Sequence, residues 1–197
     1  MQRGKADFGL LLVGILWGLG FVFVKIGLNE GITPFYLLTI RFLVAFIILF
    51  IIFRSRLKNI EKLDLKNGFI IATFLFLGFA FQISGAALTT ASNNAFFTAI
   101  NVIIVPYIFW AIHKHVPNIF SFIAAGLCIL GVGVLSFDSK MQFNQLNEGD
   151  ILTIISALFF AFHIAFTGFL STKSEPIKLN VIQMGFASVY SLIALVI

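Results

Sequence analysis

The chain has 197 residues, of which 60% are hydrophobic and 11% charged, and its formal net charge is +5. Its mean hydropathy of +1.07 excludes a soluble domain of average composition, whose helices carry polar faces. The basic residues stand in short segments between apolar runs, so they do not indicate a protein that binds nucleic acid.

Seven apolar stretches follow one another along the chain. Each is close to the roughly 20 residues that a helix needs to cross a bilayer core of about 30 Å. The fold class that we predict is therefore all-α integral membrane, a multi-helix bundle with short loops. The predicted helices cover residues 8–28, 34–53, 68–88, 94–112, 118–137, 151–171 and 179–197.

The positions of Lys and Arg predict how these helices are oriented. If the N-terminus is cytoplasmic, ten of the 13 basic residues fall on the cytoplasmic side, and only Lys140 falls outside. Cytoplasmic loops are enriched in Lys and Arg because positive charge resists translocation. We therefore expect a multi-pass protein of the cell membrane with its N-terminus in the cytoplasm. The ten residues are Arg3, Lys5, Arg54, Arg56, Lys58, Lys62, Lys66, Lys114, Lys173 and Lys178.

The start of the chain is similar to the stretch that begins near residue 150. Asp7 precedes the first helix, and Asp150 precedes the sixth, 143 residues later. Ten residues after each aspartate comes an aromatic residue followed by a small one, in Trp17-Gly18-Leu19 and in Phe160-Ala161-Phe162. This order predicts an internal repeat, although an accidental match between apolar helices is the alternative.

The repeat divides the chain into a first unit, 1–137, an external linker, 138–149, and a second unit, 150–197, with only two helices. Because the first unit holds five helices, an odd number, the second unit enters the membrane from the opposite side. Inverted repeats of this kind are characteristic of secondary transporters, which bind substrate near the bilayer midplane between the repeats.

The chain carries an ordered set of motifs, which include Trp17-Gly18 through Lys25, the stretch Ala86–Phe96, Asn101-Val102 with Val105-Pro106, and Gly149-Asp150. These motifs resemble the EamA-type half of the drug/metabolite transporter superfamily. The resemblance implies a ten-helix fold of two inverted five-helix repeats, which moves small metabolites or drugs by alternating access without a cofactor or a metal. The chain ends in the seventh of those helices, so we expect a fragment or a truncated gene product.

Polar side chains within the helices are the candidates for a substrate cavity, because burying them in a bilayer is costly. Helical spacing places Gly78, Gln82, Gly85 and Thr89 on one face, Asn94, Thr98 and Asn101 on another, and Thr153, Ser156, Phe160, His163 and Thr167 on a third. We expect these three faces to point into the bundle. The candidate cavity residues are Trp17, Arg41, Gln82, Asn101 and His163.

Each candidate has a structural alternative. Trp17 could pack within the bundle, and Arg41 could extend to the interface or bind backbone carbonyl groups. Gln82, Asn101 and His163 could bond one another between helices.

Four glycines are candidates for close helix packing. Gly14 and Gly18 form a Gly-x-x-x-Gly pair, and Gly126 and Gly133 offer a similar small face. Small residues allow helix backbones to approach closely in a membrane. These glycine faces are also candidates for the contact surface of a homodimer.

The sequence favours a secondary transporter over three other classes. A seven-helix receptor conflicts with the cytoplasmic N-terminus, and an intramembrane enzyme needs a catalytic cluster, whereas His163 stands alone among the helices. A non-transporting membrane scaffold remains the alternative. The expected partners are a small-molecule substrate and the lipid bilayer.

Overall fold

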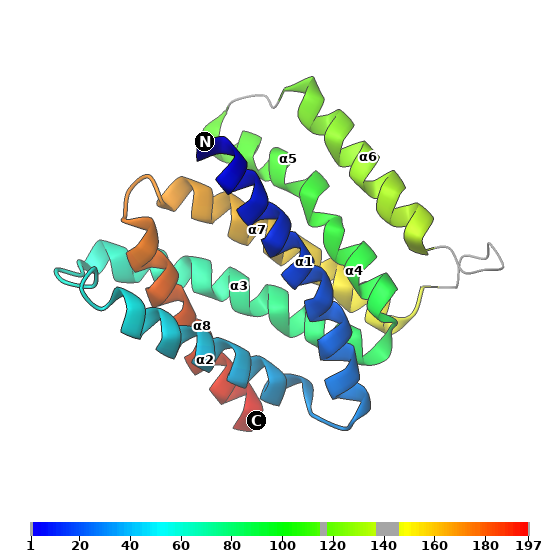
Figure 1. Cartoon of the computed structure of the whole chain (residues 1–197), viewed down its shortest axis with the longest axis horizontal. Coiled ribbons are helices and arrows are strands. Elements are labelled where there is room, and N and C mark those ends of the chain that lie inside the picture. The colour runs from blue at the N-terminus through cyan, green and yellow to red at the C-terminus, as the bar shows by residue number, and fades with distance from the viewer. Residues whose placement is uncertain (1, 115–117, 137–145, 197) are drawn as a thin grey trace.

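A computed structural model of the chain describes residues 2–114, 118–136 and 146–196, and within these ranges it contains helices and no strand (Figure 1). The all-α fold class is confirmed. Six stretches of the described chain are long and apolar enough to cross a membrane, with α4 and α5 counted as one stretch, and α6 is a further apolar helix of 18 residues. Most of the predicted linker, 138–149, lies outside the described residues. The helices are α1 (Gln2–Asn29), α2 (Pro34–Phe53), α3 (Lys62–Leu88), α4 (Ala91–Ala99), α5 (Asn101–His113), α6 (Ile119–Ser136), α7 (Glu148–Leu170) and α8 (Pro176–Val196).

Several helices begin earlier than hydropathy predicts. α3 begins six residues before the predicted position, because Glu61 and Asp64 form a capping box in which each side chain accepts a backbone N–H of the other residue. Asn147 and Asp150 do the same at the start of α7. Capping residues satisfy the free N–H groups of a first turn, so polar residues there lengthen a helix beyond its apolar core.

The predicted helix 94–112 is wrong in one respect, because it is interrupted at Ile100. The Asn101 side chain donates a hydrogen bond to the Thr98 carbonyl oxygen at 2.7 Å, and the Ile100 backbone N–H turns to the Phe97 carbonyl at 3.3 Å. Asn side chains compete in this way with helical backbone bonds. Pro106 lies inside the continuous helix α5.

α3 lies at the centre of the bundle and packs against α7 and α8, while α2 packs against α8 (Figure 1). A buried cluster joins these helices through Leu38, Phe42, Leu75 and Phe160, among other residues. The core therefore combines helices of the predicted first unit with both helices of the second.

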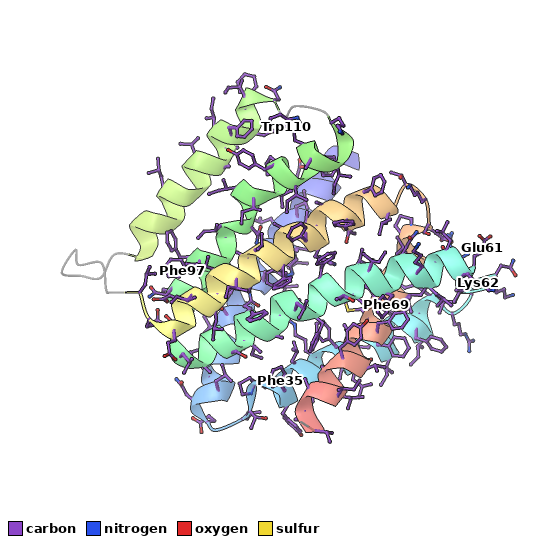
Figure 2. The ribbon with its side chains drawn as sticks, turned by 180° about the vertical axis from the view of Figure 1, so that it is seen from behind. Phe35, Glu61, Lys62, Phe69, Phe97 and Trp110 are labelled. Carbon is purple, nitrogen blue, oxygen red and sulfur yellow. The ribbon has the colours of Figure 1, made fainter. Side chains whose placement is uncertain are left out.

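α6 lies at an edge of the bundle, and α1 crosses the face that is turned toward the viewer in Figure 1 and away from the viewer in Figure 2. Among the described residues, no side chain of α1 is fully buried, and α6 contacts only α4 and α5. Lys25 links α1 to the C-terminal end of α3, because its Nζ donates a hydrogen bond to the Ala86 carbonyl oxygen at 2.8 Å.

The bundle has two ends that differ in charge. At one end, which we call the basic end, the α2–α3 turn meets the α7–α8 turn, and Arg56 pairs with Glu175 at 3.5 Å. The side chain of Asn67 also donates to Ser174 Oγ there, at 3.0 Å. The opposite end contains the end of α3 and the start of α7, joined through Asp150.

Candidate functional site

The polar faces predicted on the third, fourth and sixth helices point into the bundle, as expected. Asn94 on α4 is 1% exposed, and Thr153 and Ser156 on α7 are fully buried. Because these side chains lie in an apolar bundle, nearly all of their polar atoms need partners, and the partners define three clusters along α7.

The first cluster, at the opposite end, surrounds the buried carboxylate of Asp150, which is 1% exposed. Thr89 donates its hydroxyl to Asp150 Oδ1 at 2.6 Å, the Asn93 amide donates to the same oxygen at 3.4 Å, and the Asn147 backbone N–H donates to Oδ2 at 3.1 Å. The carboxylate thus ties α3 and α4 to α7. Sequence reasoning missed this role, although the three-residue spacing from Asn147 to Asp150 is the signal of a capping box.

The second cluster lies one to two turns further into the bundle. Asn94 donates from one amide nitrogen to the Gln82 carbonyl oxygen at 3.0 Å and to Thr153 Oγ1 at 2.8 Å. The Gln82 side chain donates to Thr98 Oγ1 at 3.1 Å, and Asn101 donates to the Thr98 carbonyl. The structure therefore brings together two of the five cavity candidates, Gln82 and Asn101, around Thr98.

The third cluster lies nearer the basic end and contains His163. Its Nε2 is 2.9 Å from Gln183 Oε1 on α8, and Gln183 in turn donates to Asn180 Oδ1 at 2.8 Å. Because an amide oxygen accepts, the Nε2 of His163 carries the proton in this bond. The sequence did not single out Gln183 or Asn180.

Between the second and third clusters, the bundle is aromatic. The Arg41 guanidinium lies 4.4 Å from the centre of the Phe79 ring, and Phe79 packs edge-on against Phe160. Among the described residues, Arg41 makes no hydrogen bond or ion pair, and its side chain is exposed on the bundle surface. A cation over an aromatic face retains its hydrogen-bond donors.

Trp17 does not join the other candidates. Its side chain is 69% exposed on the surface of α1, so it does not pack within the described bundle.

The glycine predictions stay untested. A Cβ atom added at Gly14, Gly18 or Gly126 would meet nothing within 4 Å, and the surroundings of Gly133 lie outside the described residues. Other glycines make close contacts between helices, among them Gly68, Gly78, Gly85 and Gly149. Gly85 approaches the backbone of α7. A Cβ atom there would lie 2.5 Å from Thr153 Oγ1 and 2.7 Å from the Gly149 carbonyl oxygen.

The second cluster offers uncharged hydrogen-bond donors and acceptors. Within the described residues, no three His, Cys, Asp or Glu side chains gather as metal ligands would. Gln82 Oε1 and Asn101 Oδ1 have no partner among these residues, and both side chains are partly exposed. They can accept hydrogen bonds from a bound molecule.

Comparison with known proteins gives the family. The sequence pattern of the EamA-like transporter family matches residues 4–137, which is more than half of the chain. The protein belongs to the EamA-like transporter family. It is thus a multi-pass membrane protein of a family of transporters, and the resemblance inferred from its motifs is confirmed.

A relative from Archaeoglobus fulgidus, described as an uncharacterized transporter, is 36% identical over 179 residues. The match covers 91% of this chain and 54% of that protein, so the chain spans about half the length of the relative. No solved structure matches the chain.

Proposed function

We propose that this EamA-family protein is part of a secondary transporter that moves small molecules across the cell membrane by alternating access, with its N-terminus in the cytoplasm. One observation carries the proposal. α3 and α4 of the first unit and α7 of the second enclose a line of uncharged hydrogen-bonding side chains, including Asn94 and Thr153, inside an apolar bundle. Burying polar groups at membrane depth is costly, so a continuous line of them supports a substrate pathway beside their role in joining helices.

The substrate would contact the groups that keep free hydrogen-bonding capacity. Gln82 and Asn101 supply acceptor oxygens, and Arg41 supplies donors and a positive charge. This combination favours a small polar molecule with an anionic or electron-rich group. Trp17 and His163 are the remaining candidates for contact, from α1 and from the third cluster.

Polar bonds at both ends of the α3–α7 pair are consistent with alternating access. Thr89 and Asp150 close one end, and Asn67 and Ser174 close the other. Motion of one repeat against the other exchanges which end is closed, and these hydrogen bonds are the contacts that such a motion would break in turn.

The test is uptake by proteoliposomes that contain the full chain. The probes are radiolabelled glutamate, glutamine, lysine and glucose, which cover negative, zwitterionic, positive and neutral solutes. We expect at least one probe to enter faster than into protein-free liposomes. Arg41→Gln should lower its uptake about tenfold, which corresponds to about 1.4 kcal/mol of lost binding.

Arg54→Gln is the matched control, since Arg54 is an exposed arginine at the end of α2. It should leave uptake unchanged. If none of the four probes entered, transport of these solute classes by this chain would be contradicted. If Arg41→Gln left uptake unchanged, Arg41 would have a structural role and would not contact the substrate.

A further inference from the structure

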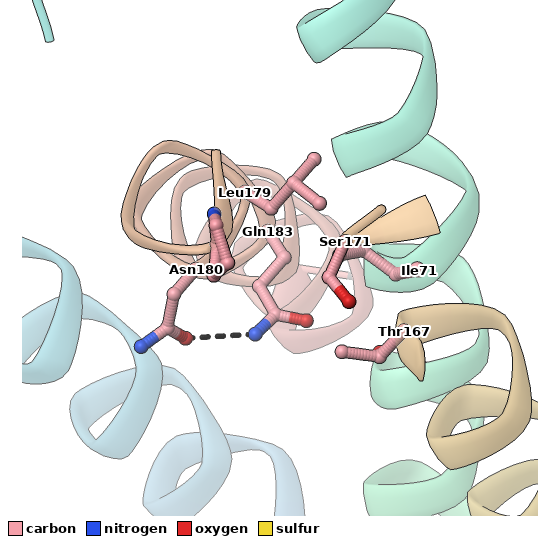
Figure 3. A pocket seen from close by; sticks show the side chains of 7 residues that line it. Ile71, Thr167, Ser171, Leu179, Asn180 and Gln183 are labelled. Carbon is pink, nitrogen blue, oxygen red and sulfur yellow. Dashed lines mark hydrogen bonds between the residues drawn. The ribbon is translucent and has the colours of Figure 1, made fainter. Parts of the chain in front are cut away.

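A cavity of about 230 Å³ lies between α3, α7 and the first turns of α8, near the basic end (Figure 3). One side is apolar and consists of Ile71 and Leu179, which are almost fully buried. The other side carries Ser171, Asn180 and Gln183. At about 30 Å³ for each water, the cavity has room for about seven waters, or for one small organic molecule.

Two carboxamides meet at this cavity. Gln183 is 6% exposed, and its amide donates to Asn180 Oδ1 at 2.8 Å, as the dashed line in Figure 3 indicates. Each amide keeps capacity beyond that bond. Within the described residues Asn180 Nδ2 has no partner, and the second N–H of Gln183 is also unused. Ser171 donates to the Gly168 carbonyl and keeps its acceptor lone pairs.

The charged side chains near the mouth of the cavity interact with residues outside its lining. Lys173 Nζ lies 4.2 Å from the centre of the Phe169 ring, and Lys178 donates to the Asn59 carbonyl oxygen at 3.2 Å. Glu175 pairs with Arg56. None of these three charged side chains lines the cavity, so a charged ligand would lose its hydration without gaining an opposite charge.

We propose that this cavity is a binding site for a small uncharged carboxamide. The carboxamide group of the ligand accepts from the Asn180 N–H and donates to Ser171 Oγ, while its apolar part lies against Ile71 and Leu179. The site is defined by its own lining, and it holds whether or not the chain transports.

The test measures protection of an introduced thiol in the full chain, reconstituted in liposomes. Cys128→Ser removes the single native cysteine, and Pro176→Cys places a thiol at the cavity, because Pro176 is exposed and lines it without taking part in the proposed contacts. The probe is benzamide, and benzoate and benzylammonium are charged ligands of the same shape. We expect benzamide to slow maleimide labelling of the thiol at least fivefold, and the two charged molecules to slow it little.

Two further variants make the result specific. Asn180→Leu keeps the volume of an exposed side chain but removes its N–H groups, and should raise the benzamide concentration for half-protection about five- to tenfold. Thr172→Cys places a thiol on the exposed residue that follows Ser171, outside the cavity. Maleimide should label this thiol at the same rate with and without benzamide.

Three results would overturn the proposal: unchanged labelling up to the solubility limit of benzamide, equal protection by the charged molecules, or equal protection at Thr172→Cys. Because the experiment measures binding, its failure would leave the proposed transport standing, and absence of transport would leave this site standing.

Discussion

Asp150 and Asp7 occupy equivalent places in the predicted sequence repeat but differ in surroundings. Asp150 is buried and accepts hydrogen bonds from Thr89 and from the Asn147 backbone, whereas Asp7 is exposed on α1. Removing an acceptor leaves buried donors unsatisfied, and this costs more than the loss of an exposed charge. The repeat predicted that the two positions correspond, but only the packing of α7 against α3 gives one of them a structural role.

We expect Asp150→Ala to lower the free energy of unfolding by about 2–3 kcal/mol, because it removes a helix cap and leaves the Thr89 hydroxyl without a partner. Asp150→Asn keeps one acceptor oxygen and should cost about half as much. Asp7→Ala is the control and should stay within about 0.5 kcal/mol. Reversible unfolding in mixed micelles, followed by circular dichroism, measures all three. Equal stabilities of the Asp7 and Asp150 variants would refute a structural role for the carboxylate.

At the scale of helices, the sequence predicted which faces are polar but not which residues meet. The spacing of Asn94, Thr98 and Asn101 was sufficient to place them on one inner face, because period alone decides this. The pairing of His163 with Gln183 could not be predicted, since the register between α7 and α8 depends on how large and small side chains interlock. The break at Ile100 also escaped prediction, because it coincides with a hydrogen bond from the Asn101 side chain to the Thr98 carbonyl, which hydropathy does not reveal.

The crossing of α3 and α7 depends on Gly85 and Gly149, which allow the two backbones to approach. Gly85→Ala should destabilise the protein by about 1–3 kcal/mol, since the new methyl group would overlap Thr153 Oγ1 and the Gly149 carbonyl. The same substitution at Gly14 meets open space within the described residues, and alanine favours a helix over glycine. Gly14→Ala should therefore be neutral or slightly stabilising in the same unfolding measurement. If Gly14→Ala were the more destabilising of the two variants, the tight helix crossing would lie on α1 instead.

At the scale of the molecule, the contacts between turns carry information on topology that hydropathy lacks. The α2–α3 turn and the α7–α8 turn meet through Arg56 and Glu175, so both lie at one end of the bundle. Four crossings separate these turns if α6 crosses together with α3, α4–α5 and α7. Two turns on the same side of the membrane need an even number of crossings between them. The four helical stretches from α3 to α7 satisfy that condition, and the basic turns then share the side on which positive charge is retained.

The N-terminus and residue 145 should therefore lie on opposite sides of the membrane. α1 and α2 return the chain to its starting side, and α3, α4–α5 and α6 then place residue 145 across the bilayer. Short epitope tags at the two positions, probed with antibody before and after the membrane is permeabilised, would measure this, and a tag at Asn59 serves as the control for the N-terminal side. If the tags at the N-terminus and at residue 145 were both accessible from the same side, the first unit would not contain an odd number of membrane-spanning helices. The second unit would then not be inverted, and alternating access between inverted repeats would lose its structural basis.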